Sequence, residues 1–204
     1  MEMKVTSIIL AGGKNLRLGR NKALEVVGGK RLIERVVERL KPLSNRILIV
    51  TSEGQVDFPP TCNAEVMVDL YPGKGPLGGI YTGLLASQSS YSIAVACDMP
   101  FLNTELLRYM VERASDSDVV IPRLDEGMVE SLHAVYSRGC LVSIRTQLEL
   151  NQLGVHSLLS KVRVKYIERE ECQKLDPQLL SFFNINCQAD LDRANALARE
   201  NEIV

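Results

Sequence analysis

A glycine pair followed by a run of cations is the first part of the chain whose residue types suggest chemistry. Gly12 and Gly13 come just after the apolar run that ends at Leu10, and four cations follow within nine residues. Glycines let the backbone turn sharply, and the N–H groups of such a turn form a concavity that binds anions. Arg17 and Lys22 are the useful candidates because a polyphosphate needs positive charge along its length. The pattern predicts a phosphate-binding loop, with a surface loop of solvated charges as the alternative.

The spacing of these glycines differs from the best-known phosphate-binding motifs. It matches neither G-x-G-x-x-G nor G-x-x-x-x-G-K-[ST], which disfavours both a dinucleotide-binding Rossmann site and a P-loop. The position of the loop supports a binding role, because ligands of open α/β sheets bind where the strands end.

Two aspartates follow apolar runs in the same way. Asp98 comes after 93–97, and a lone carboxylate at a strand end suits Mg²⁺, which takes one or two carboxylates plus phosphate oxygens. Asp69 follows 65–68, and its carboxylate could accept two hydrogen bonds from the N–H groups of guanine. The alternatives are that Asp98 caps a turn and that Asp69 begins one. The glycine- and proline-rich segment 72–79 then predicts either a loop close to the nucleotide or a long connection, before a helix that begins near Gly79.

The second half of the chain offers weaker candidates. Asn184 and Asn186 alternate with apolar residues, so an extended segment would present both amides on one face, toward the edge of a ring, a phosphate or the metal shell. They could equally satisfy loop backbone or cap the helix at Asp190. His133 lies in an apolar stretch and is interpreted as a structural histidine rather than a catalyst. Four cations could form a basic rim for an anionic acceptor, although each is more typical of a solvated surface: Arg123, Arg138, Lys161 and Arg163.

The elements that would position these residues alternate along the chain. Continuous apolar runs such as 8–10 and 93–96 are typical of strands covered on both faces of a parallel sheet. Amphipathic helical patterns over 32–40 and 104–114 fall between the runs. We therefore expect an α/β fold: a single-domain, Rossmann-like, three-layer arrangement with a mostly parallel sheet. Strands are expected at 4–10, 46–51, 65–68, 92–96, 119–121, 131–137 and 162–167, and further helices at 141–150 and 190–199.

Composition narrows the functional classes. The chain has 204 residues, 46% of them apolar, and a net charge of −1, which provides no basic field for nucleic acids or anionic membranes. It has no run of 18 apolar residues and no recognisable signal peptide, so a cytoplasmic location is expected. Five scattered cysteines and two histidines argue against a disulfide framework or a zinc site, which leaves a hard cation held by oxygen.

Five ordered segments resemble one family. The stretch LAGGKNLRLGRNKAL is similar to the signature L-A-G-G-x-S-x-R-M-G-x-D-K-A-L of the molybdenum cofactor guanylyltransferases. GKGPLGGI, CDMPF, ESLHAVY and FFNINCQADL also resemble segments of that family and follow in the same order. The resemblance covers most of the chain. It implies one nucleotidyltransferase domain over 1–204, with a nucleotide-binding half at about 1–121 and an acceptor half at about 122–204.

The resemblance also implies a reaction. The family transfers GMP from GTP to molybdopterin or the molybdenum cofactor and releases pyrophosphate, with Mg²⁺ as cofactor. Transient contacts with cofactor-biosynthesis or molybdoenzyme-maturation proteins are a further expectation. The alternatives are a related transferase that uses CTP or another phosphorylated acceptor, and an adaptor that binds GTP and molybdopterin without catalysis. The implied residues are catalytic Arg17, Lys22 and Asp98; nucleotide-binding Leu10, Ala11, Gly12, Gly13, Lys22, Asp69, Gly75 and Asp98; acceptor-binding Asn184 and Asn186; and Asp98 for the metal.

Several positions depart from the family pattern. Asn21 replaces the usual Asp before the lysine, Leu18 replaces Met, and Asn15 stands where Gly or Ser is common. Residues 50–52 lack the Asn that often ends the second strand, and Cys187-Gln188-Ala189 replaces Thr-Pro-Glu. These changes concern contacts to ribose and base more than the phosphate and metal sites.

Overall fold

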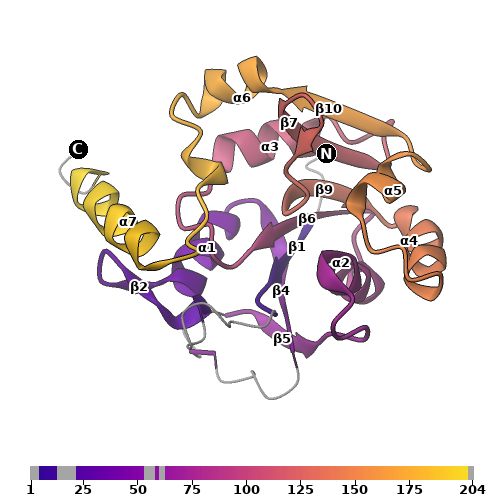
Figure 1. Ribbon diagram of the computed structural model, residues 1–204, viewed down its shortest axis with the longest axis horizontal. Coiled ribbons are helices and arrows are strands. Elements are labelled where there is room, and N and C mark those ends of the chain that lie inside the picture. The colour runs from indigo at the N-terminus through magenta and orange to yellow at the C-terminus, as the bar shows by residue number, and fades with distance from the viewer. Residues whose placement is uncertain (1–4, 13–21, 53–57, 60–62, 202–204) are drawn as a thin grey trace.

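A twisted sheet of eight strands forms the centre of the molecule (Figure 1). The structure is a computed structural model that describes residues 5–12, 22–52, 58–59 and 63–201. The strand order is β10-β7-β9-β6-β1-β4-β5, and β8 pairs with β7. The strands of this sheet are β1 (Val5–Leu10), β4 (Ser44–Thr51), β5 (Glu65–Val68), β6 (Tyr91–Ala96), β7 (Val119–Asp125), β8 (Met128–Val129), β9 (His133–Ser137) and β10 (Val164–Glu168).

Most neighbouring strands are parallel, as the sequence predicts. The pairs β1–β4, β1–β6, β4–β5 and β7–β10 are parallel, whereas β9 runs antiparallel to both β6 and β7. A tight turn at Gly127, with φ +75°, lets β8 fold back on β7 before the chain enters β9. The fold class is confirmed, with β8 and β9 as the antiparallel exceptions.

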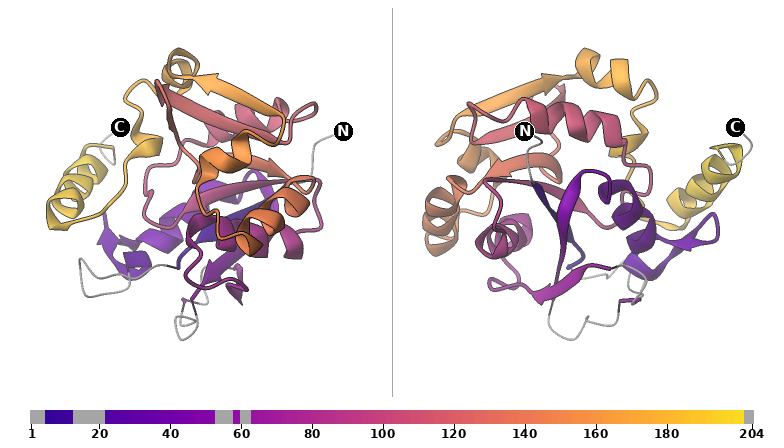
Figure 2. Two further views of the ribbon diagram at one scale, coloured as in Figure 1. Left: turned by 45° about the vertical axis from the view of Figure 1, so that its right-hand side comes forward. Right: turned by 180° about the vertical axis from the view of Figure 1, so that it is seen from behind.

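Helices cover both faces of the sheet (Figures 1 and 2). One apolar core includes residues of α1 (Leu32–Leu40), α3 (Thr104–Glu112) and α6 (Arg169–Leu175). The core on the other face includes residues of α2 (Gly75–Ala86), α4 (Cys140–Glu149) and α5 (Val155–Leu159). Each strand between two such layers must be apolar on both sides, which explains the continuous apolar runs.

Helix α2 begins earlier than the sequence indicates. It starts at Gly75, with Pro76 in its first turn, so the second half of the expected 72–79 loop is helical. Its glycines serve packing against β1. A Cβ at Gly79 would lie 2.8 Å from Leu10 Cδ2, and one at Gly83 would lie 2.4 Å from Ile8 Cγ2. This close approach requires glycine at position 83, whereas a side chain at position 79 would force the end of the Leu10 side chain to shift.

A small third core lies beside the main sheet. The hairpin β2 (Val26–Val27) and β3 (Lys30–Arg31) packs with α7 (Gln188–Asn201), and Gly28 N–H donates to Asn195 Oδ1 at 3.1 Å. Figure 2 shows α7 beside the β2–β3 hairpin, at the margin of the molecule. Two short 3₁₀ helices, η1 (Lys22–Leu24) and η3 (Leu180–Phe182), lead into the hairpin and toward α7. None of the helices within the described residues has both the length and the apolarity to cross a bilayer.

Candidate active site at the ends of β1 and β6

The strand order reverses at β1. The chain adds β4 and β5 on one side of β1 and then places β6 on the other side. Leu10 is in register with Ala96, and Cys97 N–H donates to the carbonyl of Leu10 at 3.1 Å. The loop after Leu10 and the turn that holds Asp98 therefore leave adjacent strands at the same edge, which is where ligands of such sheets bind.

Three side chains from distant parts of the sequence meet at this edge. Lys22 Nζ lies 3.3 Å from Asp98 Oδ2 and donates to Asn186 Oδ1 at 3.0 Å. The side chains of Lys22 and Asp98 are each 17% exposed, so the ion pair is largely shielded but still reaches solvent. A partly desolvated cation held in place by two oxygens is well suited to bind a phosphate.

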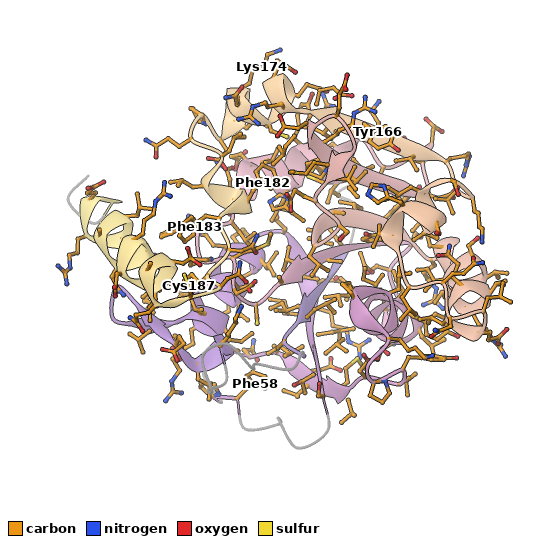
Figure 3. The ribbon with its side chains drawn as sticks, viewed as in Figure 1. Phe58, Tyr166, Lys174, Phe182, Phe183 and Cys187 are labelled. Carbon is orange, nitrogen blue, oxygen red and sulfur yellow. The ribbon has the colours of Figure 1, made fainter. Side chains whose placement is uncertain are left out.

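The segment before α7 is anchored to the same place. Ile185 N–H donates to the carbonyl of Asp98 at 3.1 Å. The Asp190 carboxylate accepts from the backbone N–H groups of Asn186, at 2.8 Å, and Cys187, at 3.0 Å, as in a capping box. The Asn186 N–H group holds the pKa of Asp190 below its usual value. Figure 3 shows Phe182, Phe183 and Cys187 along this segment as it runs from α6 to α7.

The two asparagines of this segment do different things. The exposed Asn186 contacts Lys22, whereas Asn184 donates through Nδ2 to the carbonyl of Phe182 at 3.1 Å and so supports its own loop. The alternation of these residues in the sequence predicts that both amides lie on one face of the segment. The local bond of Asn184 leaves Asn186 as the side chain that joins the cluster.

The remaining nucleotide-binding candidates lie along the same sheet edge. Ala11 N–H donates to the carbonyl of Val50 at 2.8 Å, and Gly12 is so close to β4 that a Cβ there would lie 3.1 Å from Ser52 Oγ. Gly75, with φ +66°, begins α2, and Leu10 ends β1. Gly13 and Arg17 lie outside the described residues.

Asp69 directly follows β5 and is hydrogen-bonded to α2. Its Oδ1 accepts from Tyr71 N–H and from Thr82 Oγ1, both at 2.9 Å. These bonds give Asp69 a structural role in joining strand to helix. Among the described residues, no hydrogen bond is seen to its Oδ2.

Two groups that might suggest covalent catalysis have other roles. Burial, together with the charge of Asp98, raises the pKa of Cys97 to about 12, so this thiol stays protonated. His133 is fully buried against the ring of Phe182, with centroids 4.8 Å apart, and neither ring nitrogen has a partner among the described residues. Neither group is a candidate nucleophile or base.

The four cations considered for a basic rim have other partners. Arg123 pairs with Glu168, Arg163 with Asp118, and Lys161 donates to Gln152. Arg138 donates to the carbonyl of Ser87. Each of these four cations therefore has its own partner, and the four do not form one cluster.

Sequence comparisons assign the chain to a family. Residues 7–166 match the family model described as the MobA-like NTP transferase domain. The chain belongs to this family. It is 36% identical over 199 residues to a probable molybdenum cofactor guanylyltransferase of Pelotomaculum thermopropionicum, covering 98% of this chain and 96% of that protein. It is also 36% identical over 201 residues to a molybdenum cofactor guanylyltransferase of Desulfosudis oleivorans, covering 98% of each. The family resemblance of the five segments is thereby confirmed.

Two solved structures share this fold. Molybdopterin-guanine dinucleotide biosynthesis protein A from Archaeoglobus fulgidus superposes with a TM-score of 0.83 at 28% identity, covering 96% of this chain and all of that one. A 2-C-methyl-D-erythritol 4-phosphate cytidylyltransferase from Thermus thermophilus has a TM-score of 0.74 at 20% identity, covering 97% of this chain and all of that one. The second likeness concerns the fold alone. The MobA-like chain thus has the architecture of a nucleotidyltransferase.

Two contacts in this MobA-like site were missed by sequence reasoning, and only one of them has a local signal. Asn186 is 164 residues from Lys22, and nothing in either motif indicates that the two side chains meet. The supporting role of Asp190 is a local signal that could have been found, because an acidic residue three positions after a helix N-cap often bonds back to the N-cap backbone.

Asp190→Ala is expected to slow nucleotidyl transfer about tenfold and to destabilise the fold by about 1 kcal/mol. The substitution leaves the N–H groups of Asn186 and Cys187 without their acceptor, so Asn186 holds Lys22 less firmly. Asp190→Asn keeps an oxygen acceptor and should recover most of the rate. Urea unfolding and initial rates of pyrophosphate release test this, with the exposed Asp192→Ala as control. A rate equal to that of the unmodified protein would refute the positioning role.

The stability of the protein is expected to fall between about pH 6.5 and pH 4 because of His133. Burial lowers the pKa of His133 to about 4, although the nearby Asp176 acts in the opposite direction. In the unfolded chain, His133 is therefore protonated below about pH 6.5, whereas in the folded chain it stays neutral down to about pH 4. The free energy of unfolding should fall by about 3 kcal/mol over this pH range.

Urea unfolding at pH 7.5, 5.5 and 4.5 measures this loss. His133→Phe, which keeps an aromatic ring against Phe182, should flatten the pH dependence, whereas substitution of the exposed His156 by Gln should not. If the free energy of unfolding of His133→Phe depends on pH as in the unmodified protein, another group governs stability in acid.

Proposed function

We propose that this chain transfers GMP from GTP to molybdopterin or the molybdenum cofactor, forming the guanine dinucleotide cofactor and pyrophosphate. The observation that carries the proposal is the cluster of Lys22, Asp98 and Asn186 at the switch point of a MobA-like NTP transferase fold. The names of relatives that share about a third of their residues over nearly the whole chain support the choice of GTP and molybdopterin.

The proposed chemistry needs positioning and charge neutralisation rather than a protein base. The terminal phosphate of molybdopterin attacks the α-phosphorus of GTP; a new P–O bond forms while the bond to the bridging α–β oxygen breaks, and pyrophosphate leaves. A phosphate monoester has a second pKa of about 6, so the nucleophile arrives already deprotonated. Lys22 would neutralise charge on the triphosphate, with Asn186 and Asp98 fixing the position of its ammonium group.

The donor set fits one divalent cation. Mg²⁺ commonly binds one or two carboxylates together with substrate phosphate oxygens, and Asp98 supplies one carboxylate beside a phosphate-binding lysine. Among the described residues no group of three or more His, Cys, Asp or Glu side chains could enclose a metal, so the rest of the coordination would come from substrate and water. When bound there, Mg²⁺ would offset the negative charge that develops on the phosphates.

The two halves of the chain would divide the substrates. Asp69 and the edge formed by β1, β4 and α2 belong to residues 1–121, which we assign to GTP. Residues 122–204 supply Asn186 and the segments beyond β6, which we assign to the acceptor. Passing the product to maturation proteins remains a prediction, as does a cytoplasmic location, which the four free cysteines among the described residues suit.

Pyrophosphate release tests the proposal. The purified protein is mixed with Mg²⁺, molybdopterin and one of GTP, CTP, ATP or UTP, and pyrophosphate is measured by a coupled enzymatic assay. Release with GTP that requires molybdopterin is expected, and it should stop on chelation and resume when Mg²⁺ is added. Release with CTP alone would assign the chain to the cytidylyl reaction, and binding of GTP with no release would identify an adaptor.

A further inference from the structure

Glu130 lies at the same edge of the sheet as Asp98, on the side away from the glycine loop. Strand β6 lies between β1 and β9, and Val95 of β6 is in register with His133 of β9. Ala96 N–H donates to the carbonyl of Leu132 at 3.3 Å, so the residues before His133 continue past the carboxyl end of β6. Asp98 therefore has the end of β1, with Ala11 and Gly12, on one side and the segment 130–132 on the other.

The backbone of Glu130 is held firmly in this position. Its N–H donates to the carbonyl of Pro122 on β7 at 3.1 Å, and its carbonyl accepts from His133 N–H at 3.1 Å. The first bond ties Glu130 to β7, and the second closes the turn that joins β8 to β9. The side chain is thus presented from a fixed point at the edge of the sheet and not from a long loop.

The carboxyl group of Glu130 has no hydrogen bond or ion pair with a described residue, although it is half-buried. Burial alone raises the pKa of Glu130. Arg123, on the neighbouring strand β7, already makes two hydrogen bonds with Glu168 and is not a partner for Glu130. A half-buried carboxylate without a partner is costly unless a ligand supplies donors.

We propose that Glu130 binds the aminopyrimidinone edge of the acceptor's pterin ring, with its two oxygens accepting from the ring N3–H and the 2-amino group. Two parallel bonds to adjacent donors are the arrangement that a carboxylate makes best. Guanine offers a similar edge, but Glu130 lies beyond β6 from the glycine loop and from Asp69, which places it with the acceptor. This assignment rests on the proposed function, because that function supplies the pterin.

Selectivity between two pteridines tests the inference. The probes are 6-hydroxymethylpterin phosphate and 6-hydroxymethyllumazine phosphate, in which a 2-oxo group replaces the 2-amino group, with binding followed by their fluorescence. The unmodified protein should bind the pterin at least about tenfold more tightly than the lumazine. In Glu130→Gln the ratio should fall to about one, because a glutamine amide can donate to the 2-oxo group.

Three controls make the result specific. Glu126→Gln, on the exposed turn between β7 and β8, should keep the selectivity of the unmodified protein. The preference for GTP over ITP, which lacks the 2-amino group of guanine, should be unchanged in Glu130→Gln. Thermal melting should show that Glu130→Gln folds normally, as its isosteric side chain predicts.

The failure of this inference is distinguishable from failure of the proposed function. Equal binding of the two pteridines by the unmodified protein, or unchanged selectivity in Glu130→Gln, overturns the inference even if GTP and molybdopterin yield pyrophosphate. A change in GTP/ITP preference overturns it as well, because Glu130 would then bind guanine. Absence of pyrophosphate release refutes the proposed function, whereas a pterin selectivity that depends on Glu130 would still identify a pterin-binding residue.

Discussion

Asp98→Ala is expected to abolish GMP transfer, and Asp98→Asn to reduce it by about 10³-fold or more. Asp98 forms the ion pair with Lys22 and is the carboxylate best placed for a divalent cation. Asparagine keeps the shape of the side chain but removes its charge, so Lys22 loses its ionic partner and the metal site loses its anionic ligand. The carbonyl of Asp98 still accepts from Ile185 N–H in both variants, so the fold should persist.

Single-turnover pyrophosphate release with saturating GTP and molybdopterin measures this effect. Asp116→Asn, at an exposed position of the same charge, is the matched control and should retain full activity. Thermal melts should show that the Asp98 variants remain folded. Normal turnover in Asp98→Asn would remove Asp98 from the site and the metal proposal with it.

Lys22→Ala should weaken GTP binding at least about tenfold and slow transfer about a hundredfold. The ammonium group donates to Asn186 Oδ1 and pairs with Asp98 Oδ2, which leaves a third N–H for a phosphate oxygen. Its removal eliminates that contact and also leaves the charge of Asp98 to repel the triphosphate. Both losses act on substrate binding and on the transition state.

Titration with GTP and initial rates separate the two effects. Lys22→Arg keeps the positive charge but changes its geometry, and we expect it to recover binding more than rate. Lys30→Ala, which removes an exposed lysine paired with Glu38 on the β2–β3 hairpin, should change neither. If Lys22→Ala binds GTP with unchanged affinity, Lys22 does not contact the triphosphate.

Local apolar patterns predict where strands and helices lie, whereas strand direction depends on contacts between distant parts of the chain. Apolar periodicity located α1 at its observed bounds, because burial on one face leaves a direct pattern in the residues. β5 was also predicted at its observed bounds, although this edge strand is mostly exposed. The same patterns gave the mostly parallel sheet. They could not show that β9 is antiparallel, because its direction depends on the turn at Gly127 and on its insertion between β6 and β7.

The start of α2 illustrates the limit of local signals. Segment 75–79 contains three glycines and a proline, which locally favour a loop. In the structure they form the first turns of a helix, because Gly79 and Gly83 allow α2 to lie directly on Leu10 and Ile8. The low intrinsic helix propensity of glycine is outweighed by this close packing.

The sequence by itself determined the chemical types at the site: a glycine loop with Lys22 after the first strand, Asp98 after a buried strand, and an Asn-rich segment near the end. These follow from residue type and from the strand preceding each motif. Only the tertiary structure decided that Lys22 Nζ contacts Asn186 across 164 residues, that Asn184 turns back to its own loop, and that Glu130 is half-buried without a partner among the described residues. Such contacts depend on strand order and on the packing of α7, which no local pattern encodes.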